Sequence, residues 1–186
     1  GKLAEGLESV KEAKFGLAFS SGMAAISVVM NLLKAGDHVI SCDDLYGGTY
    51  RIFEKVYKDY GLEFSYVDLT SPENLSRVLR KNTKMVWVET PTNPLLKIID
   101  LKKVSGFAKK HNLISAVDNT IATPYFQKPL NLGINIVVHS STKYLGGHSD
   151  LVGGAILTSN QAHYDRMKFC QNAVGGVPGP FDCFLV

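Results

Sequence analysis

The chain has 186 residues, of which 45% are hydrophobic and 20% are charged, and its formal net charge is +3. This composition is typical of a globular domain that can bury its own core, and the interspersed lysines and acids form no basic stripe for nucleic acid. No apolar run approaches the ~20 residues of a membrane span. Three cysteines without metal-type spacing indicate reduced thiols. We therefore expect a cytoplasmic protein that binds neither nucleic acid nor a membrane.

Motifs of several other functional classes are missing from the sequence. The five histidines show no HExxH or similar spacing, which predicts that there is no metal site. Neither GxGxxG nor GxxxxGK[ST] occurs, so a nicotinamide or nucleotide function is poorly supported. A GxSxG elbow is also missing, which argues against a hydrolase.

Apolar stretches alternate with helical patterns along the whole chain, which is typical of an α/β fold. This alternation predicts a mostly parallel sheet with helices on both faces, in which the loops that follow the strands bind ligands. Strands are expected near 15–19, 38–42, 63–67, 84–88, 113–117, 134–138 and 154–158. Helices are expected near 3–13, 22–34, 48–59, 73–80, 101–111 and 160–171.

Lys143 lies in the run HSSTKYLGGHSD at 139–150, beside three hydroxyls and after the strand-like stretch Ile134 to Val138. A lysine amine attacks a carbonyl when a site holds it close and favours its neutral form. Most lysines are instead solvated surface residues. A Schiff-base function for Lys143 is therefore a hypothesis that depends on the residues around it.

Asp118 ends the apolar run Leu113–Val117 and is followed by Asn119 and Thr120. A carboxylate at the carboxyl end of a strand can hold a proton on a heteroaromatic ring nitrogen. The alternative is a local role, because Asp and Asn also favour helix caps and turns.

The segment Ser20-Ser21-Gly22-Met23-Ala24 joins an expected strand to an expected helix. Free backbone N–H groups and the dipole at a helix start favour an anion, and Gly22 allows a phosphate to approach closely. Ordinary helix capping by serine explains the same residues without any ligand.

Several segments in order resemble the pyridoxal-phosphate enzymes of cysteine and methionine metabolism, the cystathionine γ-lyase and γ-synthase family. The resemblance runs through nearly the whole chain. It implies the large, cofactor-binding domain of the type I (aspartate aminotransferase-like) fold over residues 1–186. The segments are AFSSGMAA (18–25), DDLYGGTYR (43–51), VWVETPTNP (86–94), VDNT (117–120), HSSTKYLGGHSD (139–150) and FCQNAVGGVPGPFDCF (169–184).

The resemblance implies catalytic roles for three residues. Lys143 is expected to hold pyridoxal 5′-phosphate covalently, and Asp118 to pair with the protonated pyridine nitrogen. Tyr46 is expected to stack on the pyridine ring and to take part in proton transfer. Core packing is the alternative for Tyr46, but the adjacent Gly47-Gly48 indicates a turn.

The resemblance also implies the remaining cofactor contacts. The backbone amides of Gly22 and Met23 and the hydroxyls of Ser140 and Thr142 are expected to bind the phosphate. Asn93 is expected to reach the hydroxyl of the cofactor ring.

Glu89 lies in the same run as Asn93, and its role has two interpretations. It is either an acidic residue near the site or an anchor of its loop that pairs with Arg51. Pro91 and Pro94 predict an extended, stiff loop around it.

The resemblance implies that an N-terminal arm and a C-terminal domain are not in this chain, because family members are roughly twice as long. It also implies a homotetramer built from dimers, an amino-acid substrate, and γ-elimination or γ-replacement in trans-sulfuration. Cystathionine γ-lyase is the first hypothesis, with cystathionine γ-synthase or methionine γ-lyase as alternatives. A hypothesis from another class is a non-catalytic, cofactor-binding scaffold domain.

Overall fold

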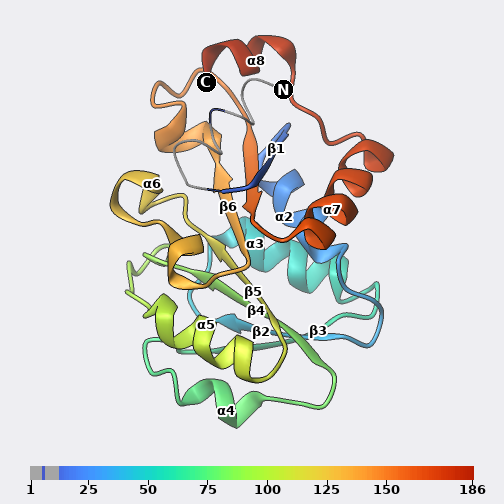
Figure 1. Cartoon of the computed structure of the whole chain (residues 1–186), viewed down its shortest axis with the longest axis vertical. Coiled ribbons are helices and arrows are strands. Elements are labelled where there is room, and N and C mark those ends of the chain that lie inside the picture. Colours follow the sequence, from blue (N-terminus) through green and yellow to red (C-terminus); the bar gives the residue numbers. More distant parts are fainter. Residues whose placement is uncertain (1–5, 7–12) are drawn as a thin grey trace.

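The computed structural model describes residue 6 and residues 13–186, and a seven-stranded sheet forms its centre (Figure 1). The strand order is β1-β7-β6-β5-β4-β2-β3. Strands β6, β5, β4, β2 and β3 pair in parallel, whereas β7 is antiparallel to both β1 and β6. The expected α/β, mostly parallel sheet is therefore confirmed. The bounds are β1 Phe15–Phe19, β2 His38–Cys42, β3 Glu63–Val67, β4 Thr83–Glu89, β5 Ile114–Asp118, β6 Ile136–Ser140 and β7 Gly154–Thr158.

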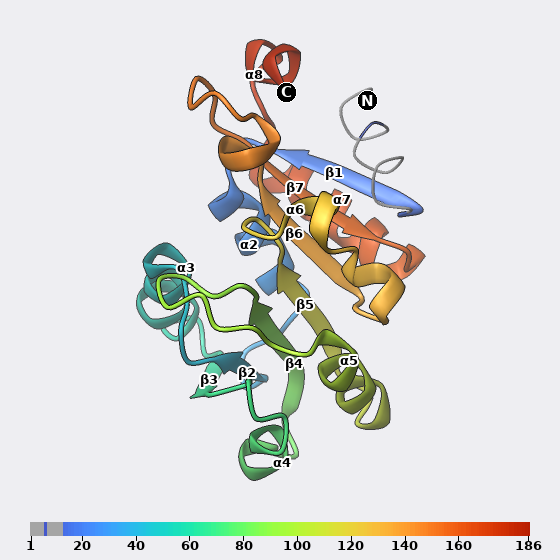
Figure 2. The ribbon, with the colours of Figure 1, turned by 90° about the vertical axis from the view of Figure 1, so that its left-hand side faces the viewer.

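Helices cover both faces of the sheet (Figure 2). Helix α2 packs on β6 and β7 together with α3 and α7, whereas α5 packs on β4 and β5 from the opposite side with η2 beside it. Within the described residues, no helix is long and apolar enough to cross a membrane. The bounds are α2 Gly22–Met30, α3 Gly47–Ile52, η1 Phe53–Tyr57, α4 Asn74–Val78, α5 Leu101–Lys110, α6 Thr123–Phe126, η2 Pro129–Leu132, η3 Ser141–Leu145, α7 Gln161–Val174 and α8 Pro180–Leu185.

Aromatic packing fills the core beneath α3. The Trp87 side chain of β4 is fully buried and meets the Phe53 ring edge-on, with 5.7 Å between ring centroids. Phe53 also stacks on Phe64 of β3 at 4.7 Å. Helices bury this sheet on both faces, which explains why its central strands are nearly continuous apolar runs.

The expected elements agree closely with the structure. All seven strands are present, and their ends differ from the expected ranges by two residues at most. The helix expected near 3–13 falls almost wholly outside the described residues. The sequence pattern missed four short elements, namely α6, η2, η3 and α8, because pieces of four to six residues carry too little periodicity.

Two of the boundaries that differ from the prediction have identifiable reasons. The helix expected to reach residue 34 ends at Met30, because the Asn31 side chain bonds back to the Ser27 carbonyl at 2.9 Å. The strand expected from residue 134 begins at Ile136. Before it, Gly133 ends η2 with a φ of +90°, and the Asn135 side chain accepts the Ser115 N–H at 2.9 Å.

His38 is a buried histidine at the start of β2. Its ring nitrogens bond to the hydroxyls of Thr83, at 2.8 Å, and Ser65, at 3.0 Å. Burial and the nearby Arg80 cation lower the pKa of His38 from 6.5 to about 4. Between about pH 6.5 and pH 4, His38 therefore stays neutral in the folded protein but binds a proton in the unfolded chain.

We predict that His38 makes the free energy of unfolding fall as the pH drops from about 6.5 to about 4. In this range the unfolded state binds the extra proton, so acid favours unfolding. Between pH 7 and pH 5, the free energy of unfolding measured with urea should fall by about 2 kcal/mol less in His38→Gln than in the wild type, because the substitution removes this titration. Equal losses in both proteins would contradict the assignment.

Candidate functional site

Three polar residues end three neighbouring strands of the sheet. Glu89 ends β4, Asp118 ends β5 and Ser140 ends β6. Glu89 is directly opposite Asp118 in the strand register, and Asp118 is opposite Val138. Because these strands are parallel, their carboxyl ends meet at one edge, where open α/β sheets bind ligands.

Thr120 connects two of these strand ends. Its hydroxyl donates to Asp118 Oδ1 at 2.5 Å and accepts the Ser140 N–H at 2.8 Å. The Thr120 N–H donates to the same Asp118 oxygen at 2.9 Å. Hydrogen bonds to Asp118 from described residues therefore go to Oδ1, and Oδ2 is left available for a ligand.

The start of α2 lies against the end of β6. Ser21 caps the helix by accepting the Ala24 N–H at 3.0 Å. A methyl group on Gly22 would lie 3.0 Å from the Ser140 Cβ, so any larger residue would push the two backbones apart by a few tenths of an ångström. Within the described residues, the Gly22 and Met23 N–H groups donate no hydrogen bond, which suits an anion there.

Two further glycines, Gly153 and Gly154, lie at the start of β7 beside the turn before α2. A methyl group on Gly154, the first residue of β7, would overlap the Ser21 carbonyl and come within 2.8 Å of the Gly22 nitrogen. One on Gly153 would overlap the Ser141 hydroxyl. At Gly154 the clash is with backbone atoms, so only glycine fits there without a backbone shift, whereas at Gly153 the Ser141 side chain would have to move.

Tyr46 completes a circuit of contacts around this edge. Its N–H donates to Glu89 Oε2 at 2.9 Å, and its ring lies over Gly48. A methyl group on Gly48 would meet that ring and would come within 3.1 Å of the Met23 sulfur. The circuit thus runs from Tyr46 to Glu89, along the ends of β4, β5 and β6 to the start of α2, and back towards Tyr46. Of the Tyr46 residue, 46% is exposed.

Two buried carboxyls lie side by side in this circuit. Burial and the neighbouring Asp118 and Asp44 charges raise the pKa of Glu89 to about 8, although the Tyr46 N–H opposes the shift. Burial also raises the pKa of Asp118, although the hydrogen bonds from Thr120 stabilise the charged form and oppose this shift. A cation next to Asp118 would relieve this cost by stabilising its charged form.

Lys143 and Thr142 lie in the turn η3 directly after Ser140. Lys143 is exposed, and its φ of −93° and ψ of −122° break the helical turn. The Thr142 hydroxyl accepts the Gly153 N–H at 3.0 Å and donates to the Gly153 carbonyl at 3.2 Å. Donation from Thr142 to a phosphate therefore requires the bond to the Gly153 carbonyl to break.

Asn93 lies on a loop outside the circuit. The Asp44 carboxylate holds this loop by accepting from the Thr92 hydroxyl and, at 2.9 Å, from the Leu95 N–H. The Thr92 N–H also donates to the Lys97 carbonyl at 3.0 Å. The loop turns back on itself, so the prediction of an extended loop is wrong.

An ion pair between Glu89 and Arg51, one of the two interpretations of Glu89, is not formed among the described residues. Glu89 bonds to the Tyr46 N–H instead, and Arg51 is exposed. Of the two interpretations of Glu89, the structure supports a position beside the candidate site.

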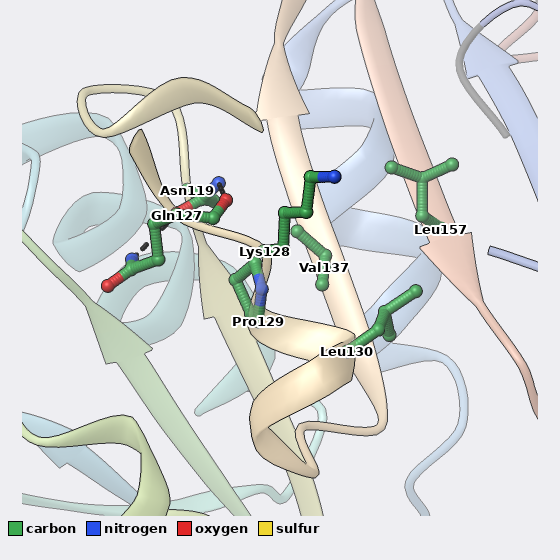
Figure 3. A pocket seen from close by; sticks show the side chains of 7 residues that line it. All are labelled: Asn119, Gln127, Lys128, Pro129, Leu130, Val137 and Leu157. Atoms are coloured by element: carbon green, nitrogen blue, oxygen red, sulfur yellow. Dashed lines mark hydrogen bonds between the residues drawn. The ribbon is translucent and has the colours of Figure 1, made fainter. Parts of the chain in front are cut away.

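Two hollows lie away from the candidate site. One, of about 10 Å³, holds roughly one water and lies beneath the segment after Asp118, where Gln127 bonds to Asn119 at 2.8 Å (Figure 3). The other, of about 480 Å³, lies between α2, η1 and the end of α7. Neither is lined by a predicted site residue. Residues 6 and 13–186 contain no cluster of His, Cys, Asp or Glu placed to hold a metal ion.

Sequence reasoning assigned no role to Thr120, Gly153 or Gly154. The strand-start pair Gly153-Gly154 was a usable signal, because glycine in a strand indicates close backbone approach. For Thr120 there was no comparable signal. Its bridge to Ser140 depends on the pairing of β5 with β6.

One known protein family matches nearly the whole chain. The family model described as Cys/Met metabolism PLP-dependent enzyme matches residues 2–186. The chain belongs to this family. Its cofactor is pyridoxal phosphate, and the expected family resemblance is confirmed.

Individual relatives carry three different names. The chain is 52% identical to a probable cystathionine gamma-synthase of Herpetosiphon aurantiacus, over 97% of the chain and 56% of that protein. It is 49% identical to a cystathionine beta-lyase of Coxiella burnetii, over 95% of the chain and 46% of that protein. A crystal structure of cystathionine gamma-lyase from Lactobacillus plantarum, complexed with L-serine, matches with a TM-score of 0.97 and 42% identity, over 98% of the chain and 48% of that structure. The chain spans about half the length of the relatives that it matches.

The site residues fit pyridoxal phosphate on grounds of this structure. The free amides at the start of α2 suit its phosphate, and the available Asp118 Oδ2 suits a protonated ring nitrogen. The half-exposed Tyr46 ring offers a flat surface near Met23 of α2 for stacking. The assignment of individual contacts stays a prediction.

We predict that Gly154→Ala destabilises the protein by about 1–3 kcal/mol, because the new methyl group must displace the Ser21–Gly22 backbone. Gly106→Ala is the matched control. No atom lies within 4 Å of a methyl group there, and alanine in helix α5 should stabilise by about 0.5–1 kcal/mol. Urea unfolding of both variants tests the pair, and equal stabilities would contradict the close approach.

Proposed function

We propose that the chain forms the cofactor-binding part of an enzyme that removes or replaces the γ-substituent of a sulfur amino acid in trans-sulfuration. The contact circuit that joins Asp118, Ser140, Gly22 and Tyr46 at one sheet edge carries this proposal. Lys143 follows Ser140 by three residues, so it lies at the same edge. Family membership supports the same chemistry.

Each residue of the site has a proposed task. When bound, pyridoxal phosphate supplies an electron sink for bonds at the substrate Cα. Lys143 holds the cofactor and then moves protons at the substrate Cα and Cβ, as γ-elimination requires. Asp118 keeps the ring nitrogen protonated through its charged carboxylate. Tyr46 stacks on the ring and assists at the leaving sulfur.

The remaining predicted residues hold the cofactor in place. The Gly22 and Met23 amides and the Ser140 and Thr142 hydroxyls bind the phosphate, and Asn93 reaches the ring hydroxyl. The start of α2 would hold the cofactor's phosphate, because the helix dipole favours an anion there.

Cystathionine γ-lyase is our first choice, a reaction in which cystathionine and water yield cysteine, 2-oxobutanoate and ammonia. Cystathionine γ-synthase and methionine γ-lyase are alternatives, and the relative named cystathionine beta-lyase adds β-elimination to them. Product analysis of the full-length protein with cystathionine separates these reactions. Bound cofactor without turnover of any sulfur amino acid would favour a non-catalytic scaffold. We further propose a tetramer of two dimers, which sedimentation of the full-length protein tests.

Lys143→Ala is expected to abolish covalent cofactor attachment. Wild-type protein mixed with pyridoxal phosphate should gain a visible absorption band, and borohydride should then fix the cofactor to the Lys143 peptide, detected by mass spectrometry. Lys109→Ala, an exposed lysine of α5, is the control and should behave as wild type. Cofactor fixed to another lysine, or an unchanged band in Lys143→Ala, would contradict the proposal.

The same substitution tests proton transfer in the full-length protein. Loss of the general base should lower turnover by at least roughly 10²–10⁴-fold. Full turnover in Lys143→Ala would overturn the assigned role.

A further inference from the structure

Glu89 makes a contact that the proposed chemistry does not use. Its side chain is 5% exposed, and Oε2 accepts the Tyr46 N–H at 2.9 Å. A buried carboxyl oxygen without a donor costs free energy, so this hydrogen bond stabilises the fold whether or not Glu89 is ionised. Tyr46 immediately precedes α3, and no side chain caps that helix start. The Glu89 carboxylate therefore supports the backbone from which the Tyr46 ring projects.

Much of the Tyr46 side chain faces solvent. Nearly half of the residue is exposed, and its ring lies against Gly48, close to the flexible Met23 side chain. Neither fixes the ring from the solvent side. The ring's position therefore depends on the backbone at residue 46.

Glu89 in turn is fixed by the sheet. It ends β4, which pairs with β2 on one side and β5 on the other. The Glu89 N–H donates to the buried Cys42 sulfur at 3.3 Å, and that thiol donates to the Asp44 carbonyl at 3.5 Å. The position of the central strand β4 thus sets the position of the backbone at Tyr46. A binding site requires side chains that are held precisely by rigid elements in this way.

We propose that Glu89 is a positioning residue that sets the location of the Tyr46 ring over the bound cofactor. This inference rests on the proposed function, because the group under the ring is pyridoxal phosphate. Glu89 acts through Tyr46 and does not touch the cofactor itself.

A competing route must be separated from this one. Glu89 lies opposite Asp118, so its removal also changes the electrostatic environment of the carboxylate assigned to the ring nitrogen. An effect carried by Asp118 persists when the Tyr46 ring is removed. An effect carried by Tyr46 disappears with that ring.

A double-mutant cycle in the full-length protein distinguishes the two routes. The apparent Kd for pyridoxal phosphate is measured by absorption titration in wild type, Glu89→Met, Tyr46→Ala and the double variant. Methionine fills the same space without an acceptor. We expect Glu89→Met to raise Kd roughly tenfold when Tyr46 is present, as loss of a stacking partner does, and less than about twofold in the Tyr46→Ala background.

Two further variants control for folding and charge. Glu89→Gln keeps an oxygen for the Tyr46 N–H and should retain a Kd within roughly twofold of wild type. Glu63→Ala removes an exposed glutamate of β3 that forms an ion pair with Arg80. This change should leave Kd unchanged. Thermal melting of the cofactor-free proteins reports folding. If Glu89→Met does not fold, Glu89→Asp replaces it, since its shorter side chain withdraws the acceptor.

Each outcome has one meaning. No saturable binding in wild type overturns the proposed function and this inference with it. Binding in wild type with an unchanged Kd in Glu89→Met overturns the inference alone. An equal rise in Kd with and without the Tyr46 ring assigns the effect to Asp118 and also overturns it.

Discussion

Parallel pairing of β4, β5 and β6 is the constraint on which the candidate site depends. It brings Glu89, Asp118 and Ser140 to one edge of the sheet, although about 50 residues of chain separate the first from the last. Thr120 then locks two of these ends together, with one hydroxyl bonded to both strands. Side chains held this way lose little further freedom when a ligand binds, which is the advantage of a site built on strands.

The two buried carboxyls carry a cost in the folded protein. Burial disfavours the charged forms of Glu89 and Asp118, and the charge of Asp118 further raises the pKa of Glu89. The proposed binding of a positively charged ring at Asp118 would offset this cost. The glycines at 22 and 154 give up side-chain packing for close backbone approach, which suits the proposed phosphate site at the start of α2.

Much of the fold could be predicted from local pattern, because apolar strand runs and helical periodicity are properties of short segments. One wrong boundary has a local cause and the other also involves a contact with a neighbouring strand. Asn31 ended α2 early by bonding to its own helix, and Gly133 with Asn135 delayed β6. The antiparallel β7 had no signature in the sequence, since strand direction is set by the path of the chain and by pairing with β1 and β6.

For the site, residue types and motif order in the sequence predicted roles for Lys143, Asp118, Tyr46 and the turn before α2, and they identified the family. Chemistry of that kind is encoded in which side chains are present. Contacts between distant segments are not encoded so directly. The packed sheet brings distant segments close together, and three contacts depend on this. They are the hydrogen bond between Thr120 and Ser140, the close approach of Gly22 to Ser140, and the hydrogen bond from Tyr46 to Glu89. Such distances depend on the whole fold, so they became visible with the three-dimensional arrangement.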